Sequence, residues 1–290
     1  LPILIKKDKK LGGVRTMTKD ILELKQIAKQ IRKDIVQMLT ESGSGHPGGS
    51  LSIVEILTAL YFKEMNINPE DPTNQDRDRF VLSKGHAAPV LYSALARRGF
   101  FNPDELMKLR KFGSILQGHP NMNYVPGVDM STGSLGQGIS VAVGMAMAGK
   151  VDQKNFRVYS VLGDGELAEG QVWEAAMAAA HYKLDNLTAF VDYNGLQIDG
   201  KTKDVMGSDP IDAKFEAFGW HVININGNDM QEVITAIEEA KNTKGKPTMI
   251  VAKTVKGKGV SFMENVASWH GTAPSKEQCE QAIKEIGGEE

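Results

Sequence analysis

The chain of 290 residues contains a single cysteine, Cys279. One thiol excludes an internal disulfide framework and a zinc site built from several thiolates. Sparse cysteine is typical of reducing compartments, so we expect a cytoplasmic protein. Neither sign of charge dominates, because 34 Lys and Arg residues against 36 Asp and Glu residues leave a net charge of −2. The composition therefore gives no reason to expect nucleic acid or a membrane surface as a partner.

The chain also lacks a convincing membrane span. Its longest uncharged stretch, residues 130–149, is about as long as one. This stretch contains five glycines together with several Ser, Thr and Gln residues. We interpret it as a loop that leads into a helix of small residues.

Residues 1–16 differ from the rest of the chain. An apolar run at residues 1–5 precedes a basic run at residues 6–10, which reverses the order found in a signal peptide. We expect residues 1–16 to be a leader or a mobile arm and residues 17–290 to be the folded domain. Thr18 is the expected N-cap of the first helix.

Short apolar runs alternate with helical patterns along the folded part. Apolar residues spaced by three and four predict helices, and short apolar runs predict buried strands. The predicted strands are residues 79–82, 158–162, 187–193, 221–226 and 247–254. The predicted helices are residues 19–40, 51–65, 87–98, 138–149, 169–182 and 230–242. This alternation indicates an α/β fold with a mostly parallel sheet and helices on both faces, and ligands beyond the carboxyl ends of the strands.

Two predicted strands end in polar side chains that suit a metal ion. Asp164 follows one strand within Gly163-Asp164-Gly165, and Asn194 follows the next strand, 30 residues later. Carboxylate and amide oxygens are ligands for Mg²⁺ or Ca²⁺, and flanking glycines let the backbone approach an anion. Each motif alone is more often a plain turn, but the pair at this spacing favours a site for a metal ion and an anion.

A second glycine-rich loop, residues 131–138, opens directly into a predicted helix. Free N–H groups at a helix N-terminus bind diphosphate well. The loop has neither the Gly-Lys-Ser/Thr ending of a P-loop nor the Gly-x-Gly-x-x-Gly order of a dinucleotide site. Close helix packing would explain these glycines equally well, so both interpretations stay open.

Four of the six histidines stand beside glycine in predicted loops, namely His46, His86, His119 and His270. Rigidly framed histidines of this kind suggest hydrogen-bonding groups for a polar substrate. A zinc site is the competing interpretation, which we rank lower because no short His-x-His or His-x₃-His spacing occurs. His181 and His221 fall in a predicted helix and strand, where we expect structural roles.

Two glutamates mark the start of the helix after Gly163-Asp164-Gly165. Stabilisation of the helix dipole is a sufficient role for Glu166, whereas composition does not settle the role of Glu169. Residues 175–180 of this helix are nearly all small. Another helix can therefore pack closely there, as in a subunit contact or a core.

Seven motifs, in this order and spacing, resemble the N-terminal, thiamin-diphosphate-binding half of transketolases. They are residues 45–49, 78–86, 118–120, 132–138, 163–170, 194–200 and 269–271. Gly163-Asp164-Gly165 with Asn194 is similar to a fingerprint shared by many thiamin diphosphate enzymes, and the paired Gly-His-Pro sequences point to transketolases among them. The resemblance covers about residue 17 to the end and implies the thiamin diphosphate-binding fold.

The resemblance also implies roles for single residues. The implied metal ligands are Asp164, Asn194 and the backbone carbonyl of Leu196. The implied cofactor-binding residues are His86, Gly133, Ser134, Leu135, Gly163, Asp164, Gly165, Glu169, Asn194, Leu196 and His270. The implied catalytic residues, which bind sugar hydroxyls or relay protons, are His46, His86, His119, Glu169 and His270. Glu169 resembles a buried glutamate of a relay between subunits.

The implied activity is transfer of a two-carbon ketol unit from a ketose phosphate to an aldose phosphate, with thiamin diphosphate and Mg²⁺ (or Ca²⁺). Full-length relatives continue beyond the matched part, so we expect the N-terminal subunit of a split transketolase, paired with a C-terminal subunit as α₂β₂. One alternative is another thiamin diphosphate enzyme, similar to 1-deoxyxylulose-phosphate synthase or a 2-oxo-acid dehydrogenase subunit, which the Gly-His loops disfavour. A non-catalytic thiamin diphosphate-binding module is the other, and the intact metal ligands disfavour it.

Overall fold

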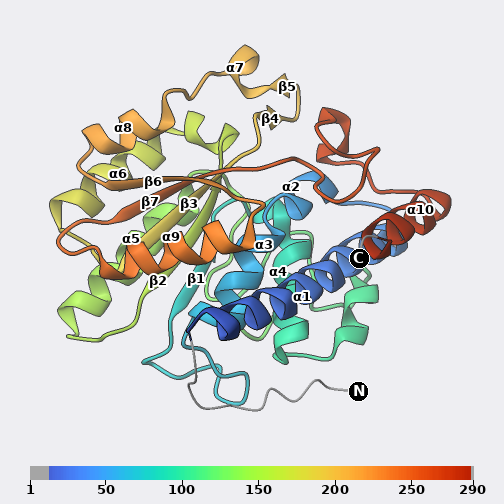
Figure 1. The fold of residues 1–290 in the computed structure, drawn as a ribbon, viewed down its shortest axis with the longest axis horizontal. Coiled ribbons are helices and arrows are strands. Elements are labelled where there is room, and N and C mark those ends of the chain that lie inside the picture. Colours follow the sequence, from blue (N-terminus) through green and yellow to red (C-terminus); the bar gives the residue numbers. More distant parts are fainter. Residues whose placement is uncertain (1–12, 289–290) are drawn as a thin grey trace.

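The computed structural model describes residues 13–288, with side chains described from residue 20 onward. Its centre is a five-stranded sheet in the order β1-β2-β3-β7-β6, in which every neighbouring pair is parallel (Figure 1). The strands are β1 Arg79–Leu82, β2 Val158–Gly163, β3 Leu187–Tyr193, β6 His221–Asn226 and β7 Thr248–Lys253. The predicted α/β fold class is confirmed.

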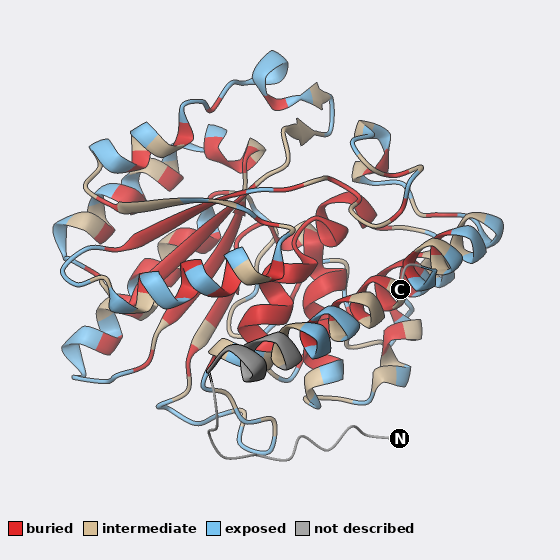
Figure 2. Cartoon of the chain, viewed as in Figure 1, coloured by how far each residue is buried: buried red, intermediate tan, exposed pale blue. Residues whose placement is uncertain are grey.

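Helices cover both faces of the sheet because the central strands are buried on both sides, as Figure 2 shows. Successive residues of a strand point to opposite faces, so Phe80 and Leu82 enter one core and Val81 the other. The first core is closed by α1 Gly13–Ser42, α3 Val54–Ala59, α4 Ala88–Arg98, α9 Met230–Asn242 and α10 Lys276–Gly287. The second is closed by α5 Gln137–Val151, α6 Gly170–His181 and α8 Ile211–Ala217.

Two predicted helix boundaries are wrong. Helix α1 begins at Gly13, so Thr18 lies inside it and is not its N-cap; no proline in residues 13–18 interrupts the helix. Residues 1–12 of the predicted leader lie outside the described residues. The helix predicted at 51–65 is divided into α2 Pro47–Leu51, α3, and a π-helical turn, η1 Leu60–Glu64.

Short elements fill the connections between strands and helices. The 3₁₀ turns are η2 Gly85–Ala87, η3 Pro103–Lys108, η4 Gly165–Ala168 and η5 Ala267–His270. A small antiparallel hairpin, β4 Leu196–Gln197 and β5 Gly200–Lys201, precedes α7 Thr202–Val205. Within residues 13–288, no helix has the length and apolar character needed to cross a membrane. The loops after β1, β2, β3 and β7 gather at one edge of the sheet.

Candidate functional site

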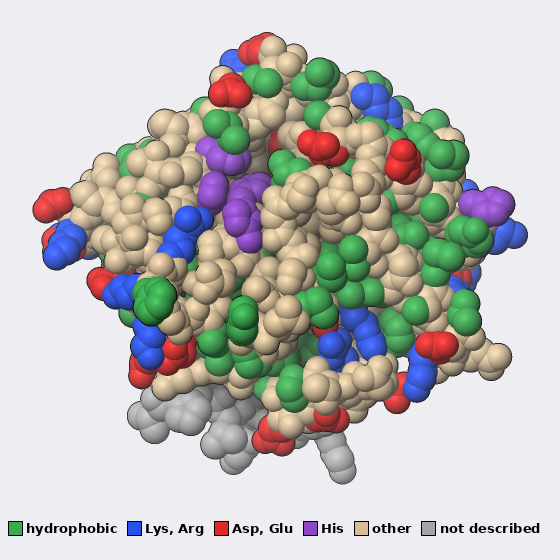
Figure 3. Space-filling view, turned by 180° about the vertical axis from the view of Figure 1, so that it is seen from behind, with side chains coloured by type: hydrophobic (Ala, Val, Ile, Leu, Met, Phe, Trp, Pro, Cys, Tyr) green, Lys and Arg blue, Asp and Glu red, His purple; other side chains and the backbone are tan. Residues whose placement is uncertain are grey.

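A cavity of about 230 Å³ lies at the carboxyl ends of the parallel strands. Figure 3 shows histidine side chains gathered at a hollow on this face of the molecule. The cavity is lined by His46, Gly49, Lys84, His86, Gly133, Leu135, Gly163, Asp164, Gly165, Glu166, Asn194, Leu196, Gln197, Ile198, Lys256 and His270. The two glycine-rich loops and three of the four loop histidines therefore meet in one place, as the parallel topology requires.

Asp164 is held in a fixed orientation at the end of β2. Its Oδ1 accepts a hydrogen bond from the Gly165 N–H at 2.9 Å. Its Oδ2 accepts from the Gly195 N–H at 2.7 Å and from the Thr202 hydroxyl at 3.1 Å. Burial, together with the nearby charge of Asp192, raises the pKa of Asp164 to about 6. A divalent cation here would favour the charged form of Asp164.

Asn194, at the end of β3, is oriented by Asp192. The Asn194 Nδ2 donates to Asp192 Oδ2 at 2.9 Å, so the amide oxygen is the atom left to act as an acceptor or a metal ligand. That oxygen accepts from the Leu196 N–H at 3.1 Å. Within the described residues, no group of three His, Cys, Asp or Glu side chains has a metal-binding arrangement. A metal site here would combine a carboxylate, an amide oxygen and a backbone carbonyl.

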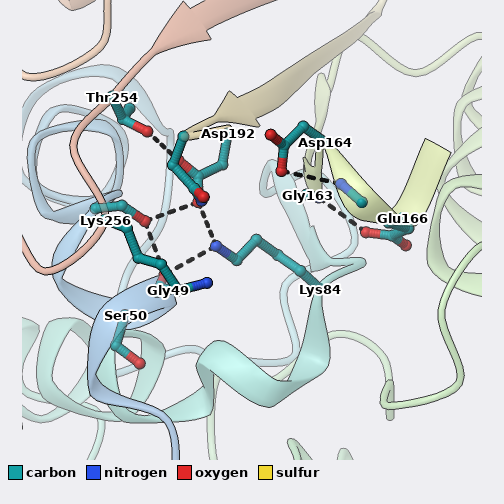
Figure 4. A network of polar contacts seen from close by, with 12 residues as sticks. Gly49, Ser50, Lys84, Gly163, Asp164, Glu166, Asp192, Thr254 and Lys256 are labelled. Carbon is teal, nitrogen blue, oxygen red and sulfur yellow. Dashed lines mark hydrogen bonds and ion pairs between the residues drawn. The ribbon is translucent and has the colours of Figure 1, made fainter. Parts of the chain in front are cut away.

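The sequence reasoning did not single out two buried lysines that line the cavity. Lys84 Nζ lies 2.5 Å from Asp192 Oδ2 and donates to the Gly49 carbonyl at 2.8 Å (Figure 4). Burial acts to raise the pKa of Asp192, but the ammonium of Lys84 and the hydroxyls of Thr254 and Ser52 together outweigh burial and lower this pKa. Lys256 donates to the Leu196 carbonyl at 3.2 Å and lies 3.0 Å from His270 Nδ1. Lys256 follows β7. Because ligands bind beyond the carboxyl ends of parallel strands, this position could have indicated Lys256 as a site residue from the sequence.

Three histidines form a cluster in the cavity. The ring of His46 lies 5.3 Å from that of His86 and 5.5 Å from that of His270, and the last two rings stack at 5.1 Å. Burial and the neighbouring cations lower the pKa of His46 to about 4 and that of His270 to about 3. Burial also lowers the pKa of His86 well below its usual range. All three rings are therefore neutral near pH 7, and each can donate one hydrogen bond and accept another.

Comparison with known proteins agrees with this geometry. Residues 23–290 match the family described as the thiamine diphosphate binding domain of transketolase. The chain belongs to this family. The fold is similar to the crystal structure of transketolase from Campylobacter jejuni, with a TM-score of 0.87 and 35% sequence identity. The superposition covers 92% of this chain and 43% of the Campylobacter chain.

Relatives of this transketolase-type domain fall into two groups by length. It is 46% identical to the 6-deoxy-6-sulfo-D-fructose transketolase subunit SqwG of Clostridium sp. (strain MSTE9), covering 93% of this chain and 98% of the relative. It is also 46% identical to human transketolase, but there it covers 91% of this chain and 42% of the relative. Relatives named as subunits are thus matched over nearly their whole length.

Three residues proposed from the family resemblance lie outside the cavity. His119 is exposed and borders a neighbouring hollow on the other side of Gly133, together with Ser134. Glu169 is exposed at the N-cap of α6, where its side chain packs beside Gly136. The burial of Glu169 between subunits stays a prediction, because no described residue of this chain covers the start of α6.

Glu166 also differs from expectation. It is 2% exposed and lines the cavity, where its carboxylate accepts three hydrogen bonds. Burial raises the pKa of Glu166, and these hydrogen bonds act against that shift. A residue that merely stabilised a helix dipole would stay in solvent, so that interpretation is insufficient.

The residues of the transketolase-type cavity fit a metal-bound diphosphate with attached rings. Lys84, Lys256 and the three-histidine cluster supply cations and N–H donors around the side chains of Asp164 and Asn194. Two buried polar atoms here, His46 Nδ1 and Gln197 Nε2, have no hydrogen-bond partner within the described residues. A Cβ atom at Gly165 would come within 3.2 Å of the Gln197 side chain, so glycine at this position leaves the most room for a bulky anion beside the backbone.

Proposed function

We propose that this chain is the thiamin-diphosphate-binding subunit of a two-subunit transketolase and transfers a two-carbon ketol unit between sugar phosphates. The observation that carries the proposal is one cavity that joins the Asp164 and Asn194 pair to the three-histidine cluster. The near-complete match to relatives that are themselves named transketolase subunits supports it. The sparse cysteine supports a cytoplasmic location.

Each end of the cofactor would have its own residues in this proposal. Asp164, Asn194 and the Leu196 carbonyl would hold Mg²⁺ or Ca²⁺. The backbone at Gly165 and the side chain of His86 would contact the diphosphate, and the two buried lysines would balance its charge. Gly133, Ser134 and Leu135 would border the rings. When bound, thiamin diphosphate supplies the electron sink for breaking the bond beside a ketose carbonyl.

The histidines would orient the sugar and move its protons. Because His46 and His270 are neutral near pH 7, either can accept a proton from a sugar hydroxyl and, once protonated, return it. His119, on the other side of Gly133, would reach the sugar from the outer rim. A partner subunit that covers the histidine rings would exclude water from the site during the transfer.

A partner subunit would complete the site. Glu169 is exposed on this chain, at the start of a helix of small residues that a second helix can approach closely. We therefore place the proposed relay role of Glu169 at a contact with a C-terminal transketolase subunit, in an α₂β₂ assembly. Relatives are named for 6-deoxy-6-sulfo-D-fructose and for apulose-4-phosphate, so the choice of ketose varies among such enzymes.

The deciding experiment is a ketol-transfer assay from xylulose 5-phosphate to ribose 5-phosphate, with Mg²⁺ and thiamin diphosphate. It is run on this chain alone and on the chain co-expressed with the product of the neighbouring reading frame. Activity only in the pair is the expected result. An inactive pair that assembles and binds the cofactor would instead favour another thiamin diphosphate reaction, such as that of a 2-oxo-acid dehydrogenase.

A further inference from the structure

The loop of residues 132–138 forms one wall of the cavity and fits tightly against the end of β1. A Cβ atom on Gly85 would come within 2.6 Å of the Gly133 nitrogen, and one on Gly138 within 2.6 Å of the Ser83 Cα. Glycine at both positions lets the two backbones touch. These contacts limit how closely the loop approaches β1, but a steric contact alone cannot hold it there.

Glu166 supplies the attractive part of this contact. Its Oε1 accepts from the Ser83 hydroxyl at 2.5 Å and from the Gly136 N–H at 2.9 Å. Its Oε2 accepts from the Gly163 N–H at 3.0 Å. One buried carboxylate thus ties the loop to the ends of both β1 and β2, as Figure 4 shows in part.

The surroundings of Glu166 exclude a simpler role. No lysine or arginine among residues 20–288 forms an ion pair with it, and the nearby buried cation Lys84 is already paired with Asp192. The side chain of Asp164, two residues earlier, is held by three hydrogen-bond donors, none of them from Glu166. Removing Glu166 would therefore release the loop and leave the metal-ligand side chain in place.

We propose that Glu166 is a positioning residue that fixes the loop of residues 132–138 in the shape that receives the rings of the cofactor. The inference rests on the proposed function, because Gly133 and Leu135 of this loop line the cavity at the end assigned to the rings. Glu166 itself touches no reacting atom in this scheme. Its effect reaches the cofactor only through the backbone of the loop.

The first test needs no cofactor. Hydrogen–deuterium exchange of the whole chain is compared between wild type and Glu166→Met, which keeps the length of the side chain but removes both acceptors. We expect peptides spanning residues 132–138 to exchange about tenfold faster, because the Gly136 N–H loses its acceptor. Glu166→Gln keeps one acceptor and should give an intermediate rate. Glu174→Met, an exposed position on α6, is the matched control and should behave as wild type.

The second test separates the two ends of the cofactor. The assembled two-subunit protein is titrated by calorimetry, in Mg²⁺, with thiamin diphosphate and with inorganic diphosphate. We expect Glu166→Met to weaken thiamin diphosphate about 10–100-fold and inorganic diphosphate less than about threefold. Equal losses for both ligands, or no loss for either, would overturn the inference. Failure of wild type to bind thiamin diphosphate would instead refute the proposed function, while the exchange result would still decide the role of Glu166 in the loop.

A second variant covers the case in which Glu166→Met does not fold. Ser83→Ala removes one of the three donors and leaves the carboxylate in place. It should raise exchange in residues 132–138 modestly and weaken thiamin diphosphate more than inorganic diphosphate. Unchanged exchange and an unchanged ratio of the two affinities would count against the proposal.

Discussion

Two buried carboxylates on neighbouring strands have opposite environments. Asp192 is paired with Lys84 and accepts from the hydroxyls of Ser52 and Thr254, so its charge is satisfied within the protein. Asp164 has only neutral donors, and burial raises its pKa. The protein therefore leaves one carboxylate in need of a cation, at the point where the strand ends converge.

Replacing Asp164 with alanine should abolish Mg²⁺-dependent binding of thiamin diphosphate. The charged ligand of the cation is lost. The fold should be retained at reduced stability, because a buried carboxylate disappears but three hydrogen-bond donors lose their acceptor. Calorimetry on the assembled protein checks the binding, and circular dichroism checks the fold. Asp204→Ala, at an exposed position of α7, is the control. Retained binding in Asp164→Ala would remove Asp164 from the metal site.

His119 should matter for the sugar but not for the cofactor. It lies on the far side of Gly133 from the cavity and is exposed. We expect His119→Ala to leave the affinity for thiamin diphosphate unchanged and to lower kcat/KM for the donor sugar about tenfold or more. Steady-state kinetics of the two-subunit protein measure this. Wild-type kinetics would make His119 an ordinary solvated side chain.

The histidine cluster should make the fold sensitive to acid. In the unfolded chain a histidine takes up a proton near pH 6.5, whereas in the folded chain His46 and His270 do so only near pH 4 and 3. Between these values the unfolded state binds more protons, so the free energy of unfolding should fall as the pH is lowered from 6.5 toward 4. Urea denaturation at several pH values measures this slope. His46→Gln should flatten it, and His181→Gln, at an exposed site, should keep the wild-type slope.

Helix α5 shows how an element carries the site. Its first turn meets Ser83, directly after β1, through Gly138, and its last turn meets Phe156 through Gly149. Glycines therefore bring the helix close to its neighbours at both ends. Between them, Gly144 faces open space within the described residues. The helix thus contains glycines in tight contact with a neighbour and a glycine with free space around it. Replacement of each kind by alanine can distinguish them.

Gly138→Ala should destabilise the fold by about 1–3 kcal/mol, because the new methyl group meets the Ser83 Cα. Gly144→Ala should stabilise it by about 0.5–1 kcal/mol, since alanine favours a helix and nothing obstructs it. Urea unfolding of the chain alone measures both. Equal effects of the two substitutions would show that contact with Ser83 does not govern the packing of α5.

The whole molecule presents its binding loops at one edge of an open sheet. The ends of β1, β2, β3 and β7 all contribute side chains, so a ligand there joins segments that are far apart in the chain. A ligand that binds only the folded state stabilises it by mass action. In the proposed site the cation would bridge the protein and the diphosphate, so the stabilising effect of each should require the other.

Mg²⁺ and thiamin diphosphate together should raise the Tm of the assembled protein, by an amount equivalent to about 2.7 kcal/mol at a hundredfold excess over Kd. Either alone should have little effect, and EDTA should reverse the shift. Differential scanning calorimetry is the measurement. A full shift with thiamin diphosphate in EDTA would show that the cation is not needed for binding.

Much of the fold could be predicted because it follows from local pattern. Strands such as residues 158–162 are mostly apolar because they are buried on both faces, and the spacing of apolar residues located α9. Asp164 and Asn194 are 30 residues apart, which is the length of one crossover connection between parallel strands. This spacing predicted that the two residues lie at the ends of adjacent strands, as they do. Ten of the proposed site residues do line the cavity.

The remaining features depend on contacts between distant segments, which no local pattern encodes. The pairing of Lys84 with Asp192 spans 108 residues, and the contact of Ser83 with Glu166 spans 83. The path of a loop decides whether Ser134 and His119 face the cavity. The exposure of Glu169 depends on what covers the start of α6. The sequence alone determined the order of strands and helices and the chemistry at each strand end. Packing in three dimensions determined which charges are paired, because the strength of an ion pair depends on the distance between the charges and on their burial.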